Sequence, residues 1–151
     1  MVKFLLAFCM LTLSSCVTLD VYEKNHLFTT QSWTSDDTLN FKFEVIDTSS
    51  YHNFYFVLRH QEKYPFKNIW IELQVKDPDT ITTIKREFTL ADNNKWLGST
   101  IDDITDHRLI FNTQPIHLKK GTYSFTIKQV MRVDPLPYVL SAGIRVQKVS
   151  R

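Results

Sequence analysis

Glycine and cysteine are both scarce in this chain of 151 residues, which contains three glycines and two cysteines. Gly98, Gly121 and Gly143 lie too far apart for a GxGxxG motif or a P-loop, which excludes the commonest nucleotide-binding sites. No run of five or more like charges occurs, and 18 basic residues nearly balance 16 acidic ones. The composition therefore gives no sign of a nucleic-acid partner and is typical of one ordinary globular domain.

Both cysteines fall within the first sixteen residues, so neither thiol can cross-link the body of the chain. Lys3 is followed by an apolar run from Phe4 to Leu13, which as a helix would reach about 15 Å, half of a bilayer core. A charged start, a short apolar run and small residues after it are typical of a secretory signal peptide. This segment is therefore predicted to direct export and not to span the membrane.

The apolar run ends in Leu13-Ser14-Ser15-Cys16, which resembles the lipobox of bacterial lipoproteins. The resemblance implies cleavage between Ser15 and Cys16, a diacylglyceryl group on the thiol of Cys16 and acylation of the new amine. We expect residues 1–15 to be a cleaved lipoprotein signal peptide and residues 16–38 to be the lipidated N-terminus and tether. An ordinary signal peptide with a chance cysteine at its end is the alternative.

Alternation of apolar and polar residues dominates the chain from residue 39 onward and predicts an all-β domain over residues 39–151. Leu39–Val45 alternates without an error, whereas residues 53–59 are denser in apolar side chains, as in a strand covered on both faces. We expect a single antiparallel β-sandwich of about eight strands. Further strands are expected at 69–75, 82–90, 116–118, 122–131 and 139–148, with an additional edge strand at 21–22.

Two local patterns predict how particular segments connect. Lys119-Lys120-Gly121 lies between two expected strands and indicates a tight hairpin turn that pairs 116–118 with 122–131. In the other pattern Thr100 precedes Asp103 by three residues, as in a capping box, so a helix of one or two turns is expected over 99–106.

Residue types that carry chemistry are present but not in catalytic spacing. The five histidines form no HxH, HxxH or HExxH motif, no GxSxG motif occurs, and Asp102, Asp103 and Asp106 lack the spacing of a calcium loop. The three aspartates are explained better as the acidic first turn of a helix, and the histidines as partly exposed residues at strand ends. We therefore predict no enzymatic activity, no metal and no cofactor. The histidines are His26, His52, His60, His107 and His117.

Aromatic residues make up 13% of the chain and gather between residues 51 and 70. Many of them are expected in the core, since aromatic side chains are favoured in sandwiches. The others suggest a contact surface for partner proteins in the segments 64–70 and 96–107, with Tyr64, Trp70, Trp96 and His107 as candidates. A carbohydrate-binding surface on the same scaffold is the alternative.

An ordered set of segments along nearly the whole chain resembles the GldH family of gliding motility lipoproteins. These segments include Leu13–Cys16, Val21–His26, Val57–His60, Asn68–Ile71, Lys95–Ser99, Gln129–Arg132 and Gly143–Val146. The resemblance implies a lipid-anchored, periplasm-facing component of the gliding machinery that binds other envelope proteins and has no small-molecule substrate. It leaves the membrane leaflet open, and only the lipidated cysteine carries over to a residue, Cys16.

Overall fold

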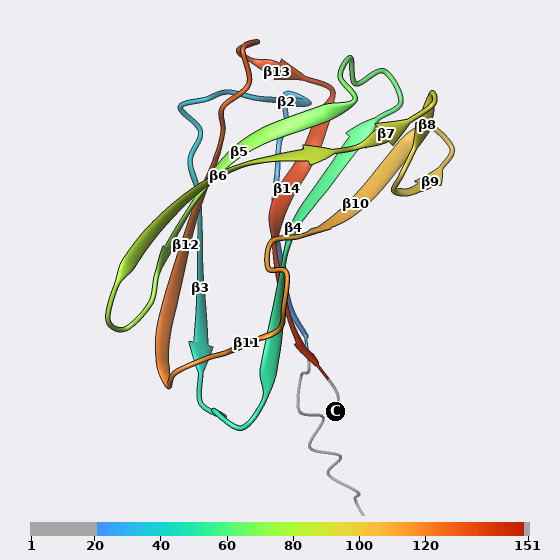
Figure 1. Ribbon diagram of the computed structural model, residues 1–151. Helices are drawn as coiled ribbons and strands as arrows, with labels where there is room; N and C mark the ends of the chain where they lie inside the picture. Colours follow the sequence, from blue (N-terminus) through green and yellow to red (C-terminus); the bar gives the residue numbers. More distant parts are fainter. Residues whose placement is uncertain (1–20, 150–151) are drawn as a thin grey trace, which may run out of the picture.

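The computed structural model describes residues 21–149, and strands are the only regular elements among them. They form two antiparallel sheets facing each other, which confirms the predicted all-β sandwich (Figure 1). Eight strands contain seven residues or more, and the other six contain two or three. The strands are β1 (Val21–Leu27), β2 (Ser32–Trp33), β3 (Leu39–Val45), β4 (Tyr51–Gln61), β5 (Asn68–Lys76), β6 (Ile81–Thr89), β7 (Ala91–Asp92), β8 (Lys95–Trp96), β9 (Ser99–Ile101), β10 (Ile104–Ile110), β11 (Ile116–His117), β12 (Gly121–Gln129), β13 (Leu136–Pro137) and β14 (Val139–Val149).

The larger sheet has the strand order β1-β14-β4-β10-β9, with β11 also paired to β4, and the smaller sheet has the order β3-β12-β5-β6. The short pairs β13–β2 and β7–β8 lie near the upper end of the sandwich in Figure 1, opposite the end at which β1 begins. In the described part of the chain no helix is long and apolar enough to cross a bilayer.

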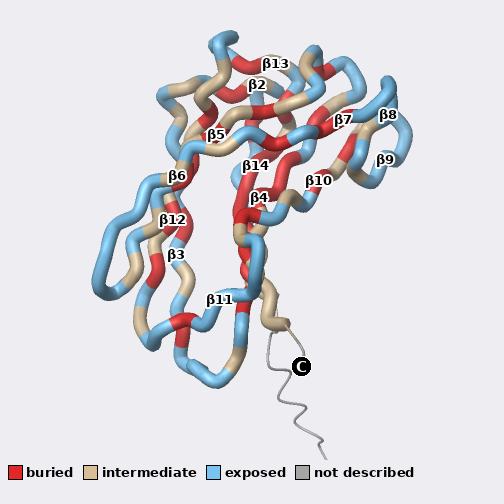
Figure 2. The backbone as a smooth tube through the Cα atoms, viewed as in Figure 1, coloured by how far each residue is buried: buried red, intermediate tan, exposed pale blue. Residues whose placement is uncertain are grey.

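Because successive side chains of a strand point to opposite faces, the alternation in the sequence gives each sheet an apolar face and a more polar face. In β3 the side chains of Leu39, Phe41 and Val45 are buried, and the polar residues between them face water. The alternation continues in β5 and β12, where buried positions follow partly buried ones along most of each strand (Figure 2). The apolar face of the smaller sheet must therefore be covered by the larger one.

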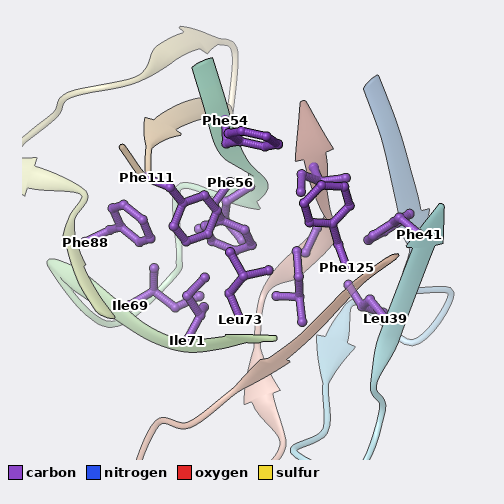
Figure 3. Packing of buried hydrophobic residues seen from close by; sticks show 14 of the residues in the cluster. Leu39, Phe41, Phe54, Phe56, Ile69, Ile71, Leu73, Phe88, Phe111 and Phe125 are labelled. Carbon is purple, nitrogen blue, oxygen red and sulfur yellow. The ribbon is translucent and has the colours of Figure 1, made fainter. Parts of the chain in front are cut away.

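The strand β4 supplies the centre of the core. Phe54, Phe56 and Leu58 are 8%, 0% and 0% exposed, and the rings of Phe54 and Phe56 point toward the smaller sheet (Figure 3). The ring of Phe54 lies 5.7 Å from that of Phe125, and the ring of Phe56 lies 5.9 Å from that of Phe88. The other face of β4 is only partly covered, so the expectation that both faces are buried is wrong for most of this strand.

The free edge of β6 is tied to the opposite sheet. A hollow of about 490 Å³ lies between β6 and residues 111–119, and one contact joins its walls while a second joins residue 119 to the turn before β6. Arg86 donates to the carbonyl oxygen of Phe111, and the ammonium group of Lys119 pairs with Asp79. The consecutive charged residues Lys85, Arg86 and Glu87 of β6 therefore suit an edge strand.

The structure corrects the expected start of the domain. Residues 21–38 were expected within the tether, but β1 and β2 lie there and belong to the sandwich. The register of β1 against β14 runs from Val21–Gln147 to Leu27–Ser141, so the expected edge strand at 21–22 is longer than predicted. The signal peptide, Ser15 and Cys16 lie outside the described residues.

Two connections also differ from the predictions. Residues 116–117 pair with β4 and not with β12, because β12 already has β3 and β5 as neighbours. Residues 99–106 form no helix but the hairpin β9–β10, with Asp102 and Asp103 in the turn. Asp102 has φ of 55°, a left-handed conformation that suits a tight turn and not a helix.

Replacing Phe56 by alanine tests the core. The substitution Phe56→Ala removes a fully buried ring and is expected to lower the free energy of unfolding by about 3–5 kcal/mol. Ile110→Ala is the control, since Ile110 is 46% exposed, and its cost is expected to stay below about 1 kcal/mol. Urea unfolding of residues 21–151 measures both, and equal costs would contradict this account of the core.

Candidate functional site

The structure separates the four candidate contact residues into two groups. Trp70 and Trp96 are partly exposed, whereas Tyr64 and His107 are 3% and 2% exposed. A partner protein cannot reach side chains that are buried to this extent. Tyr64 and His107 are therefore removed from the candidate surface.

Trp70 lies beside a surface hollow of about 530 Å³ at the end of the sandwich remote from Val21. It points outward because Ile69 and Ile71, its neighbours on β5, are fully buried in the core. Apolar, partly exposed surface of this kind is where protein interfaces form most often. The hollow, called the Trp70 hollow below, is lined by Phe66, Asn68, Trp70, Lys85, Val130, Met131, Arg132 and Val133.

The floor of the Trp70 hollow is fixed by direct contacts between strands. The backbone N–H of Trp70 donates to the sulfur of Met131 at 3.1 Å, and its carbonyl oxygen accepts from the N–H of Val130 at 2.9 Å. The ammonium group of Lys85 lies 5.9 Å from the centre of the Trp70 ring. This cation–π contact holds the ring against the sheet.

The rim of the hollow is held by residues distant in the sequence. Gln129 is fully buried, accepts from the N–H of Met131 at 2.8 Å and donates to Asp134 at 3.3 Å. Asp134 also accepts from the hydroxyl of Ser35 at 2.6 Å, and this hydrogen bond with a second from the Ser35 backbone lowers the pKa of the Asp134 carboxyl. Val133, between these fixed residues, remains 41% exposed and available to a partner.

A buried aromatic cluster supports the hollow from the side of the core. The rings of His60 and His107 stack with centroids 5.1 Å apart, and Trp96 meets His60 edge-on at 4.4 Å. Tyr64 lies 4.9 Å from His60 and 5.8 Å from Phe66, which lines the hollow. The cluster thus links the larger sheet to the candidate surface.

The histidine pair has one consistent arrangement of protons when both rings are neutral. Nδ1 of His60 lies 2.7 Å from the carbonyl oxygen of Gln61, which only accepts, so this nitrogen carries the hydrogen. Nε2 of His60 is then an acceptor, and Nε2–H of His107 donates to it at 3.0 Å. The pair therefore satisfies its buried polar atoms only in particular tautomers.

Burial keeps both rings neutral near pH 7. It lowers the pKa of His60, and it lowers the pKa of His107 to about 4 together with the repulsion that would arise if both rings were protonated. Burial also raises the pKa of the Tyr64 hydroxyl. The expectation of partly exposed histidines at strand ends is wrong for this pair and for His52, which is 3% exposed.

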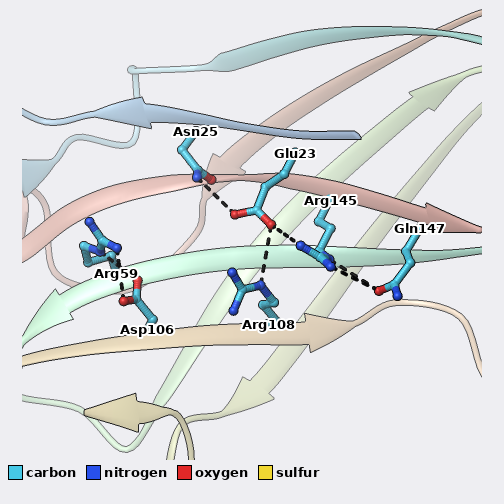
Figure 4. A network of polar contacts seen from close by, with 7 residues as sticks. All are labelled: Glu23, Asn25, Arg59, Asp106, Arg108, Arg145 and Gln147. Carbon is cyan, nitrogen blue, oxygen red and sulfur yellow. Dashed lines mark hydrogen bonds and ion pairs between the residues drawn. The ribbon is translucent and has the colours of Figure 1, made fainter. Parts of the chain in front are cut away.

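The outer face of the larger sheet carries a network of charged residues (Figure 4). Glu23 accepts from Arg145 at 2.7 Å and from Arg108 at 3.5 Å, and Arg59 forms a bidentate pair with Asp106. Burial acts to raise the pKa of Glu23, but the two arginines outweigh it and the pKa is lowered. These pairs connect the four strands β1, β14, β4 and β10 across a mainly polar face.

Among residues 21–149 no group of three or more histidine, aspartate, glutamate or cysteine side chains is placed to hold a metal ion. The predicted acidic cluster is dispersed, because Asp106 turns to Arg59 on the outer face while Asp102 and Asp103 occupy the hairpin turn. The arrangement that the sequence analysis missed is the His60–His107 pair. The signal for it was the alternation of Thr105, His107 and Leu109, which indicates a strand with an inward face.

The fold and this surface define an antiparallel β-sandwich domain with a preformed apolar hollow at one end. A family model described as GldH lipoprotein matches residues 20–146, nearly the whole described domain. The chain belongs to the GldH lipoprotein family. Membrane attachment through a lipid is implied by membership of a lipoprotein family.

Two relatives extend this comparison. The chain is 23% identical over 155 residues to the gliding motility lipoprotein GldH homolog of Christiangramia forsetii, covering 96% of this chain and 94% of the relative. It is 25% identical over 126 residues to the gliding motility lipoprotein GldH of Flavobacterium johnsoniae, covering 78% of each. No solved structure matches the chain.

Lowering the pH from about 7 to 5 is expected to lower the free energy of unfolding. The unfolded chain binds protons at its histidines near pH 6.5, whereas His60 and His107 stay neutral in the fold, so stability present above pH 6.5 is lost toward pH 4. Each proton bound only by the unfolded chain contributes a slope of about 1.4 kcal/mol per pH unit. His107→Gln, which can still donate a hydrogen bond, is expected to flatten this slope.

Urea unfolding at several pH values measures the slope, and His117→Gln is the matched control because His117 is exposed. A slope in His107→Gln as steep as in the native chain would show that the buried pair does not carry the pH dependence.

Proposed function

We propose that this chain is a lipid-anchored docking component of the gliding machinery, and that it binds other envelope proteins through the Trp70 hollow without chemistry of its own. The observation that carries the proposal is this preformed apolar hollow, whose rim residue Val133 is 41% exposed. The relatives named as gliding motility lipoproteins support the assignment to that machinery.

The anchor in this proposal is Cys16, the last residue of the lipobox-like segment Leu13–Cys16. One acyl chain alone binds a membrane only reversibly, at about 0.8 kcal/mol per buried CH₂, so three chains would make attachment lasting. Export through the signal peptide would leave the sandwich facing the periplasm. Confinement to a plane raises the effective concentration of the domain near other membrane proteins, so a weak contact at the hollow is sufficient.

The geometry favours a protein partner over a carbohydrate. A sugar that stacks on an aromatic side chain needs an open ring face. Lys85 lies against the ring of Trp70, Tyr64 is buried, and Trp96 packs edge-on against His60. Saturable binding of a glycan to residues 21–151 on a glycan array would reverse this preference.

The anchor predicts a definite chemical product. The native protein is expected to begin at Cys16 and to carry the mass of a diacylglyceryl group and an amide-linked acyl chain. Cys16→Ser is expected to remain unlipidated and to lose its attachment to the membrane fraction. Intact-mass spectrometry of both proteins measures this, and a native chain that starts elsewhere or carries a free thiol would refute the anchor.

The docking surface predicts the effect of one charge at its rim. Val133→Lys places a third cationic side chain beside Lys85 and Arg132 without removing a buried contact, and covering that charge costs about 2 kcal/mol or more. A contact at this site should therefore weaken roughly 30-fold. Crosslinking in intact envelopes, read by mass spectrometry, should show loss of the partners that the native chain recovers, together with reduced surface spreading of the cells.

The matched control is Ile110→Lys, since Ile110 is 46% exposed and lies on the larger sheet outside the hollow. This variant should recover the native set of partners. If both variants recover that set, the hollow is not the docking surface.

A further inference from the structure

The end of the sandwich at which β1 begins, called the anchor end below, gathers several loops. The strand pairings Val45–Gly121 and Tyr51–Val149 place residues 46–50 and 118–121 there, and the pairing of Lys76 with Ile81 adds the turn 76–81. Figure 1 shows the loops 46–50 and 118–121 at the lower end of the molecule, and the turn between β5 and β6 at the lower left, about level with β11.

The anchor end is the part of the domain nearest the proposed lipid. Cys16 precedes Val21 by five residues, and five residues span at most about 18 Å. The eleven residues of β4 extend over about 35 Å between the anchor end and the opposite end. If the lipid is on Cys16, as the proposed function requires, the loops of the anchor end can reach the bilayer surface.

These loops present apolar side chains to solvent. Ile46 is 74% exposed, Ile81 is 61% exposed, and Ile116 and Tyr51 are 43% and 37% exposed. In Figure 2 the lower loops are coloured mainly as exposed. Moving an exposed isoleucine side chain from water to the boundary between headgroups and acyl chains lowers the free energy.

Two acidic side chains at this end form ion pairs. Asp47 accepts from the backbone and hydroxyl of Ser49 and pairs with Lys148 at 3.2 Å. Asp79 pairs with Lys119, and Asp77 accepts from the backbone N–H groups of Asp79 and Thr80. Asp77 and Glu44 form no ion pair within residues 21–149, and the lysines at this end balance their charge, so no net negative charge opposes contact with anionic headgroups.

Two exposed lysines, Lys76 and Lys120, flank the isoleucines and make no ion pair within the described part of the chain. Lysine next to exposed apolar side chains is typical of surfaces that rest on membranes, because the ammonium group meets phosphate while the stem covers apolar area.

We propose that the anchor end rests on the bilayer surface, with the side chains of Ile46, Ile81 and Ile116 in the interfacial layer and Lys76 and Lys120 at the headgroups. The lipid then holds the domain upright, and the Trp70 hollow faces away from the membrane. This proposal rests on lipidation of Cys16.

A pair of matched cysteine variants tests the orientation. Ile46→Cys and Ile101→Cys replace side chains of 74% and 73% exposure at opposite ends of the sandwich. Each native lipidated variant is labelled with bimane and reconstituted in phosphatidylethanolamine–phosphatidylglycerol vesicles containing doxyl-labelled lipid. The emission of the label at position 46 should shift to the blue and lose intensity by quenching, whereas the label at position 101 should show neither change.

The mass of each labelled chain separates the two ways in which the test can fail. A lipidated Cys16 has no free thiol, so one label per chain is expected. Two labels would refute the anchor and the membrane contact together. One label with equal emission at both positions would refute the membrane contact alone. Unchanged far-ultraviolet circular dichroism is expected for both variants, because both positions are on the surface.

Discussion

The inward-facing side chains of β4 hold the two sheets together. The ring of Phe56 meets the rings of Trp33, Phe88 and Phe111 at 6.3, 5.9 and 6.5 Å, and these partners lie in widely separated parts of the chain. Because no disulfide joins the two sheets within residues 21–149, this packing has to hold them in place against each other. Rings in offset or tilted contact do so better than aliphatic chains, because they are large and have few rotamers.

At the upper end of β4 the inward-facing side chain is the imidazole of His60, whereas Phe54 and Phe56 face inward further down the strand. His107, the partner of His60, comes from β10, so the hydrogen bond between the rings adds direction to a contact that would otherwise be only apolar. Tyr64 and Phe66 continue the contact to the outer surface. A surface supported in this way loses little conformational entropy when a partner binds, which favours even a modest interface.

Much of the fold could be predicted from the period of two, as in β3 and β12, because burial of one face dictates that pattern. The pairing of strands could not, since alternation does not say which neighbour a strand will have, and residues 116–117 were therefore assigned to the wrong partner. The capping-box pattern over residues 100–103 predicted a helix. Residues 104–110 alternate between inward and outward side chains, however, and form the strand β10. Trp70 was identified from its residue type, whereas Tyr64 and His107 are buried among His60 and Trp96, which only the folded chain brings together.

The distribution of side chains over the sandwich assigns different tasks to its surfaces. The outer face of the larger sheet is closed by charge pairs around Glu23 and Arg145, which compensate one another and leave little for a partner to bind. Apart from Ile110, the exposed large apolar side chains gather toward the two ends, about 35 Å apart along β4. If one end were not held at the membrane, the domain could present its ends in any direction. With one end held there, rigid packing between the ends fixes the height and direction of the Trp70 hollow. The stiffness of the core then matters for function as well as for stability.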